Sequence, residues 1–437
     1  MTDDQHTRST LRILFFTGLV LGLGWAIRGV FGHWWGASWA GGMGTMALLF
    51  MIRNPNWLQR LPTISVLGAI GWGVGGIMSY GIVIGYCRAT DFGNSWYGYS
   101  MLAVIGGLYG FIGGGLPALA MESRKDQKPD WPRLLVEMSV IGYLTYWLLI
   151  TEMEWYMTPP RSEDWAVSFG ASFALAWYAY RNKFYNTLRV AAYAALGAGF
   201  GFSFGNFIQT MGAVSGVSYN WWNVMEFALG FFGGLGMAYG VMRSSWPEIS
   251  LPARKAVNWT ALIVLFFAIP FINLFQQFSG DKLTALAERL EYASTEQFIV
   301  QQQWMAFAMI LIFTGLAIYA WRKYGKGELS INQFILPAIL LFSYSLFYML
   351  FGYLKHGSFY SGFQLARSET SYWFLFVLMG VMAFVDRKRI SSLPAVDSGS
   401  TWRKFCLLVA ILMVVLIILA LISTASHDGL AGAQERF

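Results

Sequence analysis

The chain has 437 residues, of which 56% are hydrophobic and only 12% charged, and its net charge is +7. Soluble globular domains carry about twice this fraction of charged residues, so the composition excludes an ordinary soluble protein. The basic residues are scattered over short loops, which excludes nucleic acid as a partner. Two cysteines, Cys87 and Cys406, are too few for a disulfide framework or a metal site.

Apolar runs bounded by charged or loop residues follow one another along the whole chain. About 20 apolar residues cross a bilayer as a helix, and the period-two alternation of a membrane β-barrel is absent. Because lipid cannot satisfy an open backbone, helices are required. We therefore predict an all-α, polytopic transmembrane bundle of about 13 spans. The predicted spans are 12–30, 36–53, 63–86, 99–121, 133–151, 163–180, 188–212, 222–242, 256–276, 302–323, 332–354, 370–386 and 402–424.

The loops between these spans alternate in charge. With the N-terminus in the cytoplasm, 22 of the 30 Lys and Arg residues fall in cytoplasmic segments and the other eight in outer segments. Cytoplasmic loops retain Lys and Arg. We therefore expect a protein of the plasma membrane (in bacteria the inner membrane), surrounded by membrane lipids, with its C-terminus outside.

The glycine content divides the chain near Arg243, because 37 of the 48 glycines precede it. We predict that residues 1–243 form a glycine-rich core of about eight helices and that residues 244–437 add about five more. Within the second part, residues 277–303 include the sequence DKLTALAERLEYA. Its pattern is typical of an amphipathic helix on the outer surface.

Three predicted hairpins of the first part share a pattern. The first helix of each carries glycine, an aromatic residue and a small residue, and the returning helix carries clustered glycines. All three hairpins run in the same direction, which indicates parallel repeats; shared glycine-rich composition is the alternative explanation. Small residues four apart let helices approach closely. The motifs are Gly24-Trp25-Ala26 with Gly41, Gly71-Trp72-Gly73 with Gly113, and Gly199-Phe200-Gly201 with Gly233.

Polar residues share one predicted depth in these hairpins. Arg28 lies about 24 Å along its helix from Arg12, at 1.5 Å per residue. Along their helices, Glu226 lies about 26 Å from Arg243 and Asn206 about 26 Å from Arg189. Gln209 is one turn from Asn206 on the same face. A charge at the centre of a span costs about 2.5–3.5 kcal/mol. We predict that Arg28 and Glu226 line an outward-facing pocket and pair when it is empty; the alternative is that both reach the outer headgroups.

The turn after Arg28 combines glycine, aromatic and ionisable residues within a few positions. The segment GWAIRGVFGHWWG leaves almost no room to connect two spans, and its glycines permit a broken or re-entrant backbone that lines a cavity. His33 lies within this turn. A lone histidine is more often structural, and its functional alternative is a substrate hydrogen bond or a proton relay. Trp25 offers a face on which a sugar or an amine can stack.

These residues favour a secondary transporter or permease for a small polar or anionic solute. The planar fork of Arg28 suits a carboxylate, and Glu226 would carry a coupling proton, respond to a coupling cation or offset Arg28. No Walker loop or HExxH motif is present, so we expect no cofactor and regard an enzyme as the less favoured class. The predicted substrate-binding residues are Arg28, His33, Glu226, Asn206, Gln209 and Trp25.

Two other functions stay open. One is a membrane-embedded transferase that acts on a lipid-linked or acyl substrate at the outer face, with His33 as general base and Glu226 as its partner. The other is a non-catalytic membrane assembly subunit, in which the polar residues only bridge helices. The sequence does not specify the oligomeric state.

Overall fold

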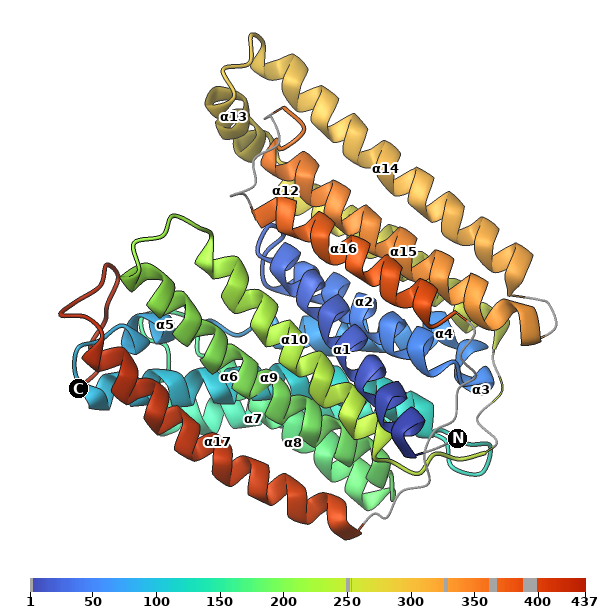
Figure 1. Ribbon diagram of the computed structural model, residues 1–437, viewed down its shortest axis with the longest axis horizontal. Coiled ribbons are helices and arrows are strands. Elements are labelled where there is room, and N and C mark those ends of the chain that lie inside the picture. Colours follow the sequence, from blue (N-terminus) through green and yellow to red (C-terminus); the bar gives the residue numbers. More distant parts are fainter. Residues whose placement is uncertain (1–2, 249–251, 253, 326–328, 361–367, 388–398) are drawn as a thin grey trace.

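The computed structural model describes residues 3–248, 252, 254–325, 329–360, 368–387 and 399–437, and over them it contains helices and no strands (Figure 1). Eight helices of this described part are long and apolar enough to cross a membrane. The prediction of an all-α protein with several helices able to cross a membrane is therefore confirmed. The larger number of thirteen spans stays a prediction, and one of the predicted ranges, 63–86, covers two helices rather than one.

The helices of the N-terminal part occupy residues 3–242. A π-helical turn at Trp147–Glu152 continues α7. The bounds are α1 Asp3–Arg28, α2 Trp34–Ile52, α3 Pro55–Leu58, α4 Leu61–Gly75, α5 Gly81–Cys87, α6 Phe92–Glu122, α7 Trp131–Tyr146, α8 Trp165–Arg181, α9 Tyr185–Val214 and α10 Trp221–Met242.

Further helices follow residue 243, and the last two of them, α16 and α17, come after longer connections than α12–α15 do. A π-helical turn at Val264–Ala268 joins α11 to α12. The bounds are α11 Lys255–Ile263, α12 Ile269–Gln277, α13 Gly280–Arg289, α14 Thr295–Tyr324, α15 Leu329–His356, α16 Ser368–Val385 and α17 Gly399–Ala425.

Six helices of the described N-terminal part close into a ring. Its order is α1, α2, α4, α6, α9 and α10, and α10 packs back on α1. The ring is thus built from the three hairpins that carry the glycine motifs. Helices α7 and α8 pair with each other outside it, where α8 contacts α6 and α9.

Glycines stand where the ring helices cross. A Cβ atom at Gly41 would lie 2.6 Å from the carbonyl oxygen of Gly68, and one at Gly113 would lie 2.6 Å from the ring of Trp72. Side chains larger than hydrogen would therefore push these helices apart. Trp72 fills the interior of the ring, where it contacts α1, α2, α6 and α10.

The duplication of the hairpins stays a prediction. Trp25 and Trp72 occupy the ring interior with their centroids 5.6 Å apart. The matching residue of the third hairpin, Phe200, instead packs on Phe204 and Phe232, with centroid distances of 5.3 and 4.7 Å.

The C-terminal helices cover one side of the ring. In Figure 1, α12, α14, α15 and α16 lie together beside α1 and α2; α15 and α12 contact α2, and α16 contacts α1. The short helix α13 buries Leu283, Leu286 and Ala287 and exposes its charged side chains, as expected of an amphipathic surface helix. Helix α17 lies apart from this group, against α6 and α9.

The predicted span 63–86 is not continuous, which corrects the sequence analysis. Helix α4 ends at Gly75, α5 begins at Gly81, and residues 76–80 are not helical. A Cβ atom at Gly76 would overlap the carbonyl group of His33, so glycine lets this break pack against the α1–α2 turn. We call the end of the ring that holds the break the His33 end, and the opposite end, where α4 begins, the Arg60 end.

Candidate functional site

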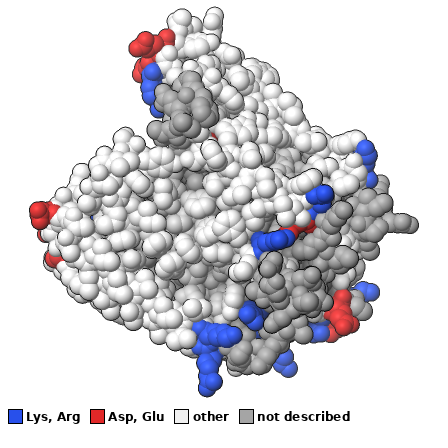
Figure 2. Space-filling model, viewed as in Figure 1, with Lys and Arg blue, Asp and Glu red and all other residues white. Residues whose placement is uncertain are grey.

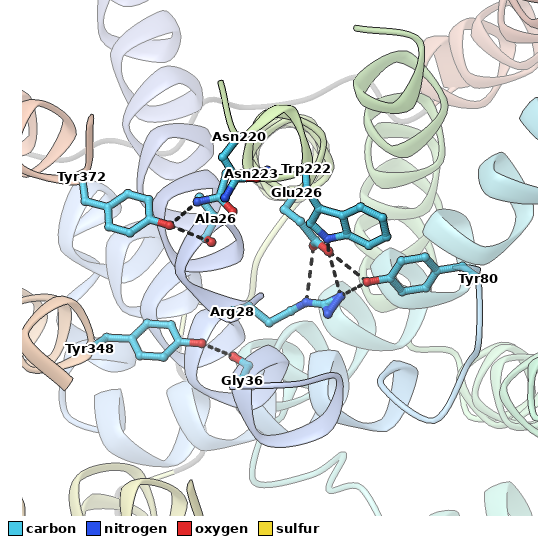
Figure 3. Close-up of polar contacts among 10 residues, drawn as sticks. All are labelled: Ala26, Arg28, Gly36, Tyr80, Asn220, Trp222, Asn223, Glu226, Tyr348 and Tyr372. Atoms are coloured by element: carbon cyan, nitrogen blue, oxygen red, sulfur yellow. Dashed lines mark hydrogen bonds and ion pairs between the residues drawn. The ribbon is translucent and has the colours of Figure 1, made fainter. Parts of the chain in front are cut away.

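A buried ion pair links the first and last helices of the ring. Arg28 is the last residue of α1 and Glu226 lies in the second turn of α10. Arg28 Nη2 lies 3.1 Å from Glu226 Oε1, and Arg28 Nε donates to Oε2 at 3.4 Å (Figure 3). Their exposed fractions are 1% and 0%. The structure therefore brings together the two charged residues that the depth argument singled out.

Two residues that the sequence analysis missed complete the environment of Glu226. The Tyr80 hydroxyl donates to Glu226 Oε1 at 2.9 Å, and Trp222 Nε1 donates to the same oxygen at 3.2 Å. Arg28 Nη2 also donates to the Tyr80 hydroxyl. Tyr80 belongs to the break between α4 and α5, so the interrupted backbone delivers its side chain directly to the ion pair (Figure 3). Gly75 and Gly76, shortly before Tyr80, were the available signal, but glycines in an apolar run do not by themselves predict a break.

The C-terminal helices hold the two sides of the α1–α2 turn. Tyr372 on α16 donates to the carbonyl oxygen of Ala26 at 3.1 Å, and Tyr348 on α15 donates to that of Gly36 at 2.8 Å. Asn223, on the same helix as Glu226, donates to the Tyr372 hydroxyl. Because carbonyls at the end of a helix lack intrahelical partners, the Tyr372 bond satisfies one and fixes the position of Arg28.

Aromatic donors lie toward the ring interior from Arg28. The guanidinium carbon of Arg28 is 4.8 Å from the centroid of Trp25, in cation–π geometry, and Trp25 meets Tyr109 edge to face at 5.0 Å. Trp25 Nε1, Trp72 Nε1 and the Tyr109 hydroxyl are buried and have no hydrogen-bond partner in the described part of the protein. Buried polar groups are normally satisfied, so these groups mark a place where a ligand or water would be stabilised. The Trp25 ring itself is already covered by Arg28.

A pocket of about 580 Å³ opens at the His33 end. It is formed by the α1–α2 turn, the α4–α5 break, the loop before α8 and the end of α12. Arg28 and Glu226 are not among its lining residues. His33 in its wall meets Tyr80 edge to face at 5.0 Å, and Tyr80 bonds to the ion pair, so these two rings connect the pocket to the pair. The lining residues are Phe31, Gly32, His33, Trp34, Gly76, Ile77, Met78, Ser79, Arg161, Ser162, Gln276 and Gln277.

His33 is exposed to solvent in this pocket. The surrounding protein and the positive charge of Arg28 lower the pKa of His33 to about 4. The imidazole is therefore neutral at physiological pH, and one ring nitrogen can accept a hydrogen bond.

The structure does not bring Asn206 and Gln209 to the ion pair. Both are buried on α9, and the Asn206 amide atoms and Gln209 Oε1 have no hydrogen-bond partner among the described residues. Asn206 lies beside the Cys87 thiol, close to α17, where the Ser423 hydroxyl donates to the Cys87 carbonyl oxygen at 3.1 Å. Phe202, one turn earlier on α9, is the residue that faces Tyr80. Asn206 and Gln209 therefore belong to a separate polar cluster.

No group of three His, Cys, Asp or Glu side chains within the described ranges is arranged to hold a metal ion. Comparison with protein-family models, curated proteins and solved structures gives no match. The function therefore has to be inferred from the site itself. Its chemistry is a buried arginine paired with one carboxylate, with hydrogen-bond donors that have no partner among the described residues on one side and an open pocket on the other.

Proposed function

We propose that the protein is a secondary transporter for a small polar or anionic solute, which binds at the Arg28–Glu226 pair. The observation that carries the proposal is the interruption of the α4–α5 helix at residues 76–80, between the pocket and the ion pair. Non-helical backbone at membrane depth is tolerated where it is buried in protein or lines a cavity. Broken helices at the binding site are typical of secondary transporters.

The ion pair suggests how binding and coupling would work. A buried charge without a partner is strongly unfavourable, so Arg28 needs either Glu226 or an anionic group of the solute. A solute carboxylate that replaces Glu226 on Arg28 would leave Glu226 to take up a proton, or to be offset by a coupling cation. The unsatisfied groups of Trp25, Trp72 and Tyr109 would donate the next hydrogen bonds as the solute moves into the ring.

We also propose a plasma-membrane location, in bacteria the inner membrane, with thirteen spans and the His33 end outside. The charge distribution supports this orientation. In the view of Figure 2, most of the visible Lys and Arg atoms gather near the N-terminal end of the bundle, and a broad uncharged surface covers the middle of the molecule. Cytoplasmic loops retain Lys and Arg, which favours a cytoplasmic Arg60 end and an outer C-terminus.

Transport is tested with the full chain in proteoliposomes. Uptake of radiolabelled succinate, lactate, phosphate and glucose is measured under an imposed proton gradient for the wild type, Arg28→Gln and Glu226→Gln. We expect saturable uptake of at least one solute by the wild type and its loss in both variants. Arg133→Gln is the control, because Arg133 is exposed and pairs with Glu137 away from the ring. Undiminished uptake by both site variants, or no uptake by the wild type, would contradict the proposal.

A transferase is the second candidate, because the pocket opens at the His33 end and exposes a neutral imidazole there. Against it, the described ring contact of His33 is with Tyr80 rather than with a carboxylate that would orient a general base. His33→Gln separates the two functions. A transferase would lose turnover altogether, whereas the proposed transporter would keep saturable uptake with weaker solute binding, because Arg28 and Glu226 are unchanged.

A further inference from the structure

A second buried arginine lies at the opposite end of the ring. Arg60 directly precedes α4 and is 5% exposed, and its Nε and Nη2 atoms have no hydrogen-bond partner among the described residues. Burial lowers the pKa of Arg60 to about 10. The guanidinium group therefore stays protonated at neutral pH, and the described part of the chain places no ion-pair partner on it, which is costly for a buried charge.

Arg60 lines a pocket of about 360 Å³ that also carries Lys128 and Arg254. Neither Asp nor Glu is among its lining residues. Two acids adjoin lining residues in sequence, and both carboxylates accept hydrogen bonds from backbone amides. Asp130 accepts from the amide of Arg133 and so caps α7, and Glu122 accepts from the amides of Asn186 and Thr187. The described lining of the pocket therefore carries positive charges and no carboxylate. Its lining residues are Arg60, Thr63, Val66, Leu67, Ala120, Ser123, Lys128, Pro129, Trp131, Pro252, Arg254 and Val257.

Helix N-termini converge on the same space. Within the described part, α4 begins at Leu61, α7 at Trp131 and α11 at Lys255, each at or next to a residue that lines the pocket. The N-terminal end of a helix carries a partial positive charge and unpaired backbone N–H groups, and both favour anions. These helix ends add to the charges of Arg60, Lys128 and Arg254.

We propose that this Arg60 pocket binds a phosphate group, supplied either by an anionic lipid headgroup or by soluble phosphate. The planar guanidinium fork matches the paired oxygens of a phosphate, and Lys128 and Arg254 supply flexible charges at the rim. The apolar lining residues Val66, Leu67 and Val257 leave space for the less polar part of a lipid. The proposal does not depend on the transport function, because the pocket lies at the other end of the ring from Arg28.

The test uses the purified full chain in nanodiscs and has two arms. In the first, nanodiscs of phosphatidylcholine alone are titrated with inorganic phosphate and binding is measured by calorimetry. In the second, nanodiscs contain equal amounts of phosphatidylglycerol and phosphatidylcholine, and the lipids that remain bound after mild detergent extraction are identified by native mass spectrometry. Binding in the first arm indicates soluble phosphate, and enrichment of phosphatidylglycerol in the second indicates a lipid headgroup.

Variants test whether Arg60 is responsible for the binding of phosphate or phosphatidylglycerol. Arg60→Gln should weaken phosphate binding, or reduce the enrichment of phosphatidylglycerol, at least about tenfold. Arg60→Lys keeps the charge but loses the planar guanidinium fork, so its binding should be weaker than that of the wild type and stronger than that of Arg60→Gln. Arg124→Gln is the matched control, because Arg124 lies in the same loop as Lys128 but pairs with Asp126. If Arg60→Gln does not fold, Lys128→Gln combined with Arg254→Gln should still weaken binding severalfold. Equal binding by the wild type and these variants, or none by the wild type in either arm, would overturn the proposal.

Discussion

Arg28 and Arg60 show two outcomes of the same physical problem. Each is almost fully buried next to a helix end. At the His33 end the chain provides the counter-charge itself, because Glu226 and Tyr80 surround the guanidinium group. At the Arg60 end the described residues provide none for Nε and Nη2. The comparison teaches that burial alone does not define a site; what differs is whether the protein satisfies the charge internally or leaves it for a ligand.

The largest expected effect is the loss of one partner of the ion pair. Arg28→Met or Glu226→Gln should each lower the free energy of unfolding by about 3–5 kcal/mol, because the remaining polar group is buried without its partner. The double variant should lose less than the sum of the two. Denaturant titration in mixed micelles measures all three. If the losses of unfolding free energy in the two single variants add up to that of the double variant, the two residues act independently. Arg28 would then not differ from Arg60 in having an internal counter-charge.

Tyr80→Phe should have the next largest effect. It removes the hydroxyl that donates to Glu226 and accepts from Arg28. Hydrogen bonds to charged groups contribute about 1.5–3 kcal/mol, and the same titration measures the loss. Tyr143→Phe is the control, because Tyr143 is 69% exposed. An unchanged stability in Tyr80→Phe would mean that the α4–α5 break is held by other contacts.

Arg60→Gln, unlike the variants of the ion pair, should not destabilise the protein. Removal of a buried charge that lacks a partner should leave the free energy of unfolding unchanged or raise it by about 1 kcal/mol in phosphate-free buffer. Added phosphate should raise the melting temperature of the wild type and not that of the variant. A destabilised variant in phosphate-free buffer would show that Arg60 has a structural partner, so the two arginines would no longer differ.

The smallest expected effect is a pH dependence at His33. The folded-state pKa of about 4 lies below the ordinary value of 6.5. Between these values the unfolded chain binds a proton that the folded chain does not, so stability should fall as the pH drops from 6.5 toward 4. The melting temperature of the wild type should therefore decline over this range more steeply than that of His33→Gln. Equal slopes would assign the decline to other groups.

The sequence predicts most of the helices because the apolar runs have the length of a helix and are bounded by charged or loop residues; the run 63–86, which is interrupted, is the exception. It predicts the contact of Arg28 with Glu226 because the axial position along a helix follows from the 1.5 Å rise. It does not predict which way a side chain points around the helix axis. Asn206 shares the depth of Glu226, yet it faces Cys87 and α17 rather than Arg28. Rotation about the axis is set by packing against neighbours that the sequence does not identify.

Two features of the candidate site depend on such packing. The break at residues 76–80 interrupts an apolar stretch that is long enough to cross the membrane, so composition alone favours a continuous helix. Glycine at position 76 permits the break, but the neighbouring carbonyl of His33 explains why glycine is needed there. The role of Tyr80 follows from the break and could not be predicted without it.

The separation of Arg28 and Glu226 along the chain has a consequence for biosynthesis. The two residues are 198 positions apart, so a ribosome that adds about 5–20 residues per second delivers Glu226 to the membrane about 10–40 s after Arg28. During this interval the first helix presents an arginine to the translocon or the lipid before its counter-ion exists. Insertion of the nascent chain therefore requires water or lipid headgroups to solvate that arginine until α10 is inserted and the ring can close.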